Sequence, residues 1–282
     1  MENNNKGNGI FLGVIGVATL VVAIIGATFA FFSANASSDP NAIETTSTKI
    51  ALGFDDDTDT NEKALKTNLI PAADRLAIYG ANNQSGDKEC IDDNTNEICS
   101  TYTFTVANPS ATTAQRIFTN ITVQTNTFGN LYFALYEVND GTVGDQVIAP
   151  TPFIKPATGE TPGVSYSTNE GGKTVVSLDA ITQYLGVSAT AVSDENKDDM
   201  SKYTVNTTEV AGQQVQNMKT YKLIIWIHEL KPETGAVEGA DYNQNDSDAG
   251  RSFAAGINIS TSAGGSGVTA VISAAGAAPT QE

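Results

Sequence analysis

Histidine, cysteine, tryptophan and basic residues are all scarce in this chain of 282 residues. One histidine and two cysteines leave little material for a zinc centre or a histidine-based catalytic triad. The 15 lysines and arginines face 32 acidic residues, which gives a formal net charge of −17. Because nucleic-acid binding depends on basic residues that neutralise phosphates, the composition excludes a nucleic-acid partner. It also excludes docking on anionic lipid through a basic patch.

Enzyme motifs are missing as well. The single histidine is His228, and Pro232 stands where a His-Glu-x-x-His zinc-protease motif requires its second histidine. The sequence contains no Gly-x-Ser-x-Gly elbow, no P-loop and no dinucleotide-binding fingerprint. We therefore do not expect an enzyme, and we expect His228, in a strand-like sequence, to face solvent.

An uncharged apolar run of 23 residues occupies Ile10–Phe32. As a helix it would measure about 35 Å, enough to cross the ~30 Å hydrocarbon core of a bilayer. Ala34 and Ala36 follow with the Ala-x-Ala spacing that signal peptidase recognises. Residues 1–36 are therefore either a cleaved signal peptide or a retained transmembrane anchor. Both alternatives export residues 37–282, and both limit membrane contact to the N-terminal segment.

The two cysteines agree with export. Cys90 and Cys99 bracket a loop of eight residues, and an oxidising compartment allows them to pair. A metal site is disfavoured because no further thiol and no histidine pair accompanies them. We predict a disulfide, which contributes about 2.7 kcal/mol in the chain-entropy model for a loop this short.

Alternation of apolar and polar residues dominates the exported part and predicts β-strands. The strand near 221–227 is apolar on both faces, which is typical of a central strand. Turn signals separate the strands without the βαβ alternation of a parallel sheet, so the predicted fold is an all-β antiparallel sandwich of the jelly-roll or immunoglobulin type. The predicted strands cover residues 50–54, 102–106, 117–123, 131–135, 221–227, 253–259 and 268–272.

Within the exported part, apolar residues recur at helical spacing in one segment only. Leu178, Ile181 and Leu185 recur at helical intervals and predict one short helix. The surrounding residues, from about 140 to 215, are polar and irregular. We interpret them as a loop-rich elaboration of a single domain over residues 37–282.

An acidic stretch follows the first predicted strand. Asp55, Asp57, Asp59 and Asn61 place oxygen ligands at alternate positions, as in the opening of a calcium loop. The pattern then fails, because Glu62 stands where the loop requires glycine. A weak extracellular calcium site and a solvated acidic turn are the two alternatives, and no other cofactor is predicted.

Two segments resemble the TasA/camelysin group of exported bacterial proteins. Gly26–Ser33 carries Gly-x-Thr-x-Ala-x-Phe-Ser at the end of the leader, and Tyr102–Asn108 carries Tyr-x-Phe-x-Val-x-Asn in a strand. The resemblance covers only part of the chain. It implies a jelly-roll-like sandwich and a subunit of biofilm matrix fibres. Some members of the group are classed as metallopeptidases, a role that the missing His-Glu-x-x-His motif does not support here.

The strand that carries Ile50, Leu52 and Phe54 follows the leader after a short linker. It can pair within its own sandwich, or it can be donated to an open sheet edge of a neighbour, with these side chains setting the register. Repeated head to tail, donation builds a filament. We therefore expect an exported cell-surface structural protein that forms an extracellular fibre or matrix with itself as partner. The alternative is a membrane-anchored adhesin or ligand-binding module, with a pilin-like variant, that binds other surface proteins.

Overall fold

The computed structural model describes residues 52–56, 62–64, 69–84, 89–157, 159, 161–229, 251–261 and 268–275. The chain divides into a unit of Met1–Ile50 and a unit of Ala51–Glu282, and all described residues belong to the second. The predicted leader, with Ala34 and Ala36, lies outside the described residues. Within the described part of the chain, no helix has the length and apolar character needed to cross a membrane.

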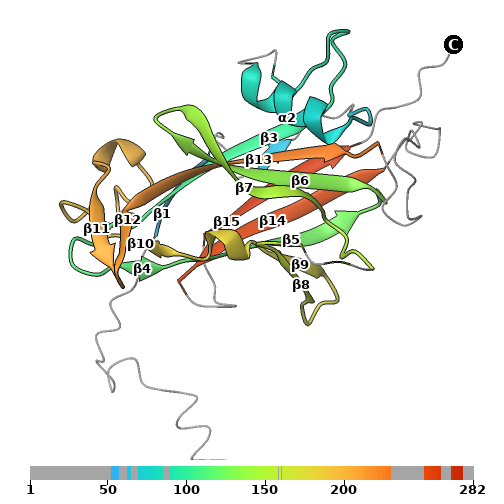
Figure 1. The fold of residues 1–282 in the computed structure, drawn as a ribbon. Coiled ribbons are helices and arrows are strands. Elements are labelled where there is room, and N and C mark those ends of the chain that lie inside the picture. Colours follow the sequence, from blue (N-terminus) through green and yellow to red (C-terminus); the bar gives the residue numbers. More distant parts are fainter. Residues whose placement is uncertain are drawn as a thin grey trace, which may run out of the picture. The chain divides into compact units, whose positions relative to one another are not determined.

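Two sheets form the body of the second unit (Figure 1). All strand pairs described within them are antiparallel, except for one parallel pair at an edge of the larger sheet. The all-β antiparallel sandwich predicted from the sequence is thus confirmed. The five-stranded sheet has the order β1 (Gly53–Asp56), β3 (Ser100–Ala107), β13 (Met218–Ile227), β6 (Leu131–Asn139) and β7 (Thr142–Pro152). The six-stranded sheet has the order β2 (Glu62–Ala64), β15 (Val268–Ala275), β14 (Ser252–Ser260), β5 (Phe118–Asn126), β9 (Thr174–Ser177) and β8 (Ser165–Thr168).

The main core fills the space between the two sheets. In β3 the alternating residues Tyr102, Phe104 and Val106 point into it and are at most 1% exposed. The threonines between them lie half-buried on the outer face of the sheet. The period-2 pattern of the sequence therefore decides which side of this strand packs against the second sheet.

Aromatic rings connect the two sheets across this core. The ring of Phe153, just after β7, lies 4.7 Å from that of Phe133 in β6 and 4.6 Å from that of Phe253 in β14. All three side chains are buried. The tilted arrangement, with ring planes 39° and 45° apart, is one that aromatic pairs favour.

β13 is the middle strand of the five-stranded sheet and is buried on both faces. Leu223 and Ile225 face the main core, whereas Ile224 and Trp226 face outward, and all four are 0% exposed. The prediction of a central strand is confirmed. Because a sheet exposes its outer face to water unless something covers it, this strand requires a second cover.

That cover is the cap, residues 69–84 and 89–99, which contains α2 (Asp74–Asn83). Figure 1 shows α2 lying over the five-stranded sheet, away from the six-stranded one. Ala77, Gly80 and Ala81 recur at helical spacing and are buried against the sheet side. Their small size allows close approach, since a Cβ on Gly80 would come within 3.1 Å of the Ile98 side chain.

The helix predicted around Leu178–Leu185 was wrong. The chain forms one turn of 3₁₀ helix at Asp179–Ile181, followed by β10 (Tyr184–Leu185), which pairs with β4 (Gln115–Arg116). The N–H of Ile117 donates to the carbonyl of Gln183 at 2.8 Å, so the backbone pairs with a neighbouring segment instead of continuing a helix. The apolar residues at helical spacing are buried nevertheless.

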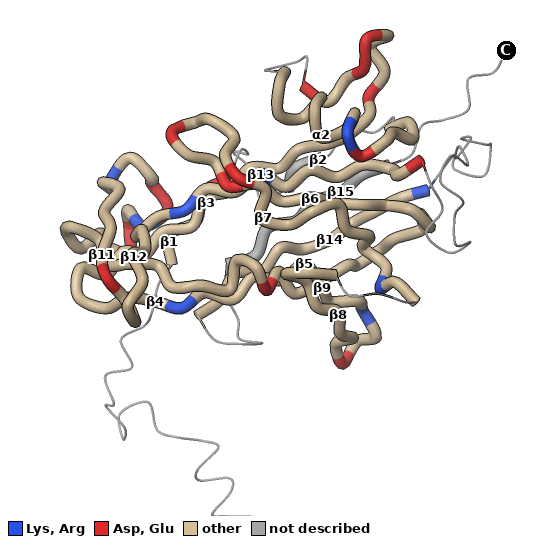
Figure 2. Tube along the Cα trace, in the orientation of Figure 1, with Lys and Arg blue, Asp and Glu red and all other residues tan. Residues whose placement is uncertain are grey.

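The stretch from 140 to 215 is more regular than its composition suggested. It supplies β7, β8 and β9 to the two main sheets, and a hairpin of β11 (Thr207–Val210) and β12 (Gln213–Gln216). A second 3₁₀ turn spans Met200–Lys202. Figure 2 shows that acidic residues gather in loops and turns, including those of this stretch.

The disulfide that closes the cap provides the first test. Cys90 and Cys99 are bonded at an S–S distance of 2.05 Å, and both residues are 0% exposed. We expect the Cys90→Ala/Cys99→Ala variant to lose about 3 kcal/mol of unfolding free energy, because the unfolded chain regains loop entropy. Urea titration measures the loss, and the wild type in reductant should show a similar one. An unchanged midpoint would mean that packing alone holds the cap.

Candidate functional site

The strand β1 lies at the edge of the five-stranded sheet and pairs with β3 of the same chain. Its register sets Phe54 opposite Val106. Leu52 is 6% exposed, and the Phe54 ring stacks 6.3 Å from that of Phe104. Two of the three predicted donation residues thus pack into the core, and Ile50 lies outside the described residues. In this structure the strand pairs within its own sandwich, which is one of the two alternatives left open by the sequence.

The other side of β1 is closed by residues 197–203, which we call the clasp. The N–H of Phe54 donates to Asp198 Oδ1 at 3.1 Å, and the Tyr203 hydroxyl donates to the carbonyl oxygen at the start of the clasp at 2.8 Å. A Cβ added at Gly53 would overlap both that carbonyl oxygen and the Tyr203 hydroxyl. β1 therefore occupies a slot between β3 and the clasp, and the slot admits only glycine at its narrowest point.

Two tyrosine hydroxyls fix the slot at its ends. Burial, together with the nearby charge of Asp198, raises the pKa of Tyr203 from 10.0 to about 12. Its hydroxyl therefore stays protonated and keeps its donor role throughout the physiological range of pH. At the end of β1, Tyr102 donates to Asp56 Oδ2 at 2.6 Å. This bond ties the last residue of β1 to β3.

A buried asparagine holds the chain that follows the clasp. Asn217 accepts from the N–H of Asn206 at 2.7 Å, and its amide donates to the carbonyl of Thr204 at 3.2 Å and to the Ser188 hydroxyl at 3.1 Å. The backbone carbonyl of Asn217 accepts from the backbone N–H of Asn108, just beyond β3, at 2.8 Å. The clasp is thus tied to the same strand, β3, that pairs with β1.

The predicted calcium residues are only partly within the described chain. Asp55 lies on the exposed side of β1, while Asp57, Asp59 and Asn61 fall outside the described residues. Within the described residues, no group of three or more His, Cys, Asp or Glu side chains could hold a metal ion. Calcium binding by this loop stays a prediction.

His228 does not face solvent, contrary to expectation. Its side chain is 12% exposed, its Nε2 lies 3.0 Å from Asp74 Oδ1, and its ring stacks on Tyr132 at 4.3 Å. The indole N–H of Trp226 donates to the same Asp74 oxygen at 3.2 Å. The residue is under the cap because the cap, which the sequence pattern did not reveal, crosses this end of β13. This cluster attaches α2 to the sheet.

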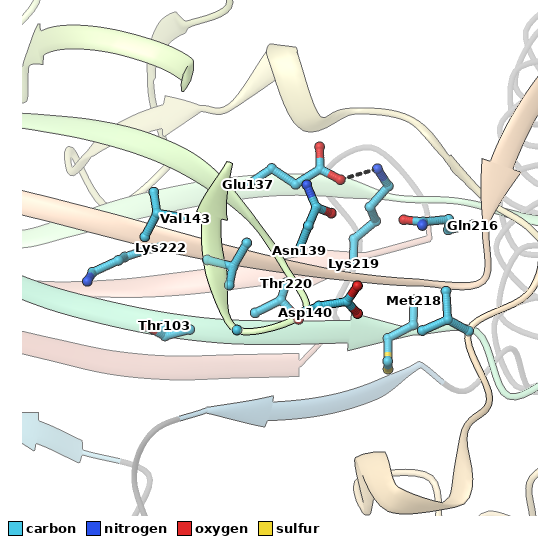
Figure 3. Close-up of a pocket in the computed structure, with 13 residues that line it drawn as sticks. Thr103, Glu137, Asn139, Asp140, Val143, Gln216, Met218, Lys219, Thr220 and Lys222 are labelled. Atoms are coloured by element: carbon cyan, nitrogen blue, oxygen red, sulfur yellow. Dashed lines mark hydrogen bonds and ion pairs between the residues drawn. The ribbon is translucent and has the colours of Figure 1, made fainter. Parts of the chain in front are cut away.

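A groove of about 930 Å³ opens on the five-stranded sheet next to the cap (Figure 3). It forms where β6 stops pairing with β13, because the β6 register begins at Thr220 and leaves Met218 and Lys219 paired only with β3. The turn of the β6–β7 hairpin forms one wall, and the segment after the clasp contributes Val205 to another. The lining residues are Thr103, Glu137, Val138, Asn139, Asp140, Gly141, Val143, Val205, Gln216, Met218, Lys219, Thr220 and Lys222.

Most charges in the groove form ion pairs. Lys219 pairs with Glu137 of the neighbouring strand β6, as Figure 3 shows. Lys222 pairs with Glu89 of the cap and also donates to the carbonyl of Ala81 at 2.6 Å. Opposite charges therefore cancel at both lysines. The groove adds no net basic patch to this acidic chain.

Sequence reasoning missed the groove and the clasp. Gln216, Asn139 and Val205 carry no motif, because they come from separate elements that only the fold brings together. The cap had one readable signal: small residues spaced three and four apart from Ala77 to Ala81, preceded by acidic Asp74, a favourable charge at a helix N-terminus.

Comparisons with known proteins add little. No protein-family model matches the chain, and no curated protein matches it. Among solved structures, the CooA pilin subunit from enterotoxigenic Escherichia coli aligns at 12% identity over 81% of this chain and 99% of that chain, with a TM-score of 0.25. At that TM-score the likeness supports no inference about this chain.

The slot around Gly53 provides the second test. We expect Gly53→Ala to lower the unfolding free energy by about 1–3 kcal/mol, because the new methyl group meets backbone of the clasp that cannot easily move. Gly129→Ala is the matched control, since a Cβ there has no atom within 4 Å. Chemical denaturation of both variants measures the difference. Equal stabilities would show that β1 does not occupy the slot.

Proposed function

We propose that the chain is an exported structural protein of the cell surface, a non-catalytic subunit of an extracellular fibre or matrix that assembles by donation of β1. In the assembly, β1 of one copy occupies the slot between β3 and the clasp of the next. The partner is a second copy of the same chain. Repetition of this contact without closure builds a filament.

The position of β1 is the observation that carries the proposal. It is the first described strand after the N-terminal unit, it has only four residues, and it lies at a sheet edge. Leu52, just before the strand, is nevertheless buried in the core, and the half-buried Phe54 of β1 packs against it. Such a strand makes the same contacts whether it pairs in its own chain or in another copy. Because few backbone pairs must break, it can exchange between the two.

Export is supported by two features of the sequence and one of the structure. The apolar run at Ile10–Phe32 and the Ala34–Ala36 spacing are those of a secretory leader. The Cys90–Cys99 disulfide suits an oxidising compartment. The resemblance to the TasA/camelysin group supports a matrix fibre as the assembled form.

The acidity of the chain limits how the subunits can meet. Like-charged copies at −17 repel each other, and salt screens this repulsion over about 8 Å at physiological ionic strength. Backbone hydrogen bonds and the apolar side chains of β1, rather than surface charge, are therefore the attractive contacts of the proposed joint.

A cross-linking experiment tests donation directly. Asp55 and Thr105 are register partners in β1 and β3, at a separation that a disulfide can bridge. Two differently tagged chains, Asp55→Cys and Thr105→Cys, are exported together from one host. We expect covalent pairs that carry both tags on a non-reducing gel.

Two controls make this result decisive. The doubly substituted chain, Asp55→Cys/Thr105→Cys, shows that the pair can form a disulfide at all. Replacing the partner chain by Ser167→Cys, on the exposed edge strand β8, should abolish the mixed product. Cross-links confined to the doubly substituted chain would overturn donation.

A second candidate is a membrane-anchored adhesin or ligand-binding module, pilin-like or otherwise, favoured by the groove beside the cap. The N-terminal residue of the native protein separates the two functions. A fibre subunit freed from its leader should begin at Ser37, after the Ala34–Ala36 site. An intact Met1, together with single particles in detergent, would favour the anchored module.

A further inference from the structure

Two amide side chains, those of Asn139 and Gln216, line the groove beside the cap. Among the described residues, the side-chain amides of Asn139 and Gln216 make no hydrogen bond to backbone or to another side chain. Figure 3 shows both among the residues that line the groove. Each amide offers two donors and an acceptor in one plane. Planar amides of this kind can form paired hydrogen bonds with adjacent hydroxyl groups.

The charges of the groove disfavour an ionic ligand. Lys219 is neutralised by Glu137, and Lys222 is neutralised by Glu89 while it also donates to the cap backbone. An anion would have to compete with these carboxylates inside a chain of net charge −17, and separating partly buried ion pairs is costly. A neutral ligand leaves both pairs intact.

The remaining lining residues offer apolar contact beside the polar groups. Val143, Val205 and Met218 come from three separate segments of the chain and border the groove. A sugar ring combines hydroxyl groups around its rim with C–H groups on its faces, so it matches such a mixture. The volume of about 930 Å³ lies near the upper end of the ~300–1,000 Å³ typical of small-molecule sites. It therefore accommodates a short chain of sugars rather than one.

We propose that this groove binds a neutral oligosaccharide chain, with Asn139 and Gln216 hydrogen-bonded to sugar hydroxyls and the apolar border packed against ring faces. The floor consists of β3 and β13, and only Met218 and Lys219 of β13 lack a paired strand on the side of β6, an edge too short for an extended peptide to add as a strand. A surface protein with this site would attach to polysaccharide. Sugar binding does not require exchange of β1, so either property can fail while the other holds.

Calorimetric titration of the full chain, kept in a detergent without a sugar headgroup, tests the proposal. The probes are cellotetraose, maltotetraose, mannotetraose and tetra-N-acetylchitotetraose, with tetragalacturonate as the anionic comparison. We expect at least one neutral probe to bind with a dissociation constant of roughly 1 mM or below. Tetragalacturonate should bind more weakly, because the groove offers it no unpaired cation.

Variants then locate the binding. Gln216→Ala and Asn139→Ala should each weaken the bound probe about three- to tenfold, the effect of one lost hydrogen-bonding group. Gln214→Ala, a neighbouring exposed glutamine of β12 outside the groove, should bind as the wild type does. Melting temperatures confirm that the variants fold. Absence of binding by all four neutral probes, preference for the anionic one, or equal affinity in all three variants would overturn the proposal.

Discussion

The constraint on which the rest of this domain depends is that β13 is apolar on both faces. Its inner residues pack on the six-stranded sheet, but Ile224 and Trp226 project from the outer face, where water would otherwise reach them. Burying two side chains of this size is worth several kcal/mol, roughly 1.5–3 for each. The cap satisfies that demand with a helix of small residues, a disulfide-closed loop and the Asp74 contacts to Trp226 and His228. A third layer thus exists because a central strand cannot be left half-covered.

The cover extends only as far as the apolar residues do. Toward the start of β13, the next outward positions are the polar Lys222 and Thr220, followed by the half-buried Met218, and here the cap ends and the β6–β7 hairpin turns away. The groove is therefore a direct consequence of where the outer face of one strand changes from apolar to polar. The clasp closes the slot, and Val205, two residues beyond the clasp, borders the groove.

Strands were predictable here because alternation is a local property, as β3 shows: its buried and half-buried residues follow the sequence one by one. The cap was not predicted, because Ala77, Gly80 and Ala81 pack a helix by being small, and their spacing is a weaker signal than an apolar stripe. The helix predicted from Leu178, Ile181 and Leu185 was wrong for the opposite reason. Their apolar side chains have helical spacing, but they are buried at a junction between a 3₁₀ turn and a strand. Asn139 and Gln216 lie far apart in the sequence and are brought to the same groove only by the fold, so no sequence pattern predicts that they share a site. The disulfide was predicted correctly because a chain with only two cysteines, separated by a short loop, allows only one pairing.

The start of the domain has a mechanical consequence. β1 ends at Asp56 in the five-stranded sheet, and β2 begins at Glu62 at the edge of the six-stranded sheet, where it runs parallel to β15. One short stretch of chain therefore pairs with a strand in each of the two sheets. If a neighbouring copy supplies that stretch, β1 and β2 act as a bivalent ligand. Once one strand is bound, the effective concentration of the other at its site is on the order of millimolar. Four residues in one sheet and three in the other would each detach readily alone. A released strand therefore rebinds while the other still holds, and the stretch separates only when both pairings are broken before either re-forms.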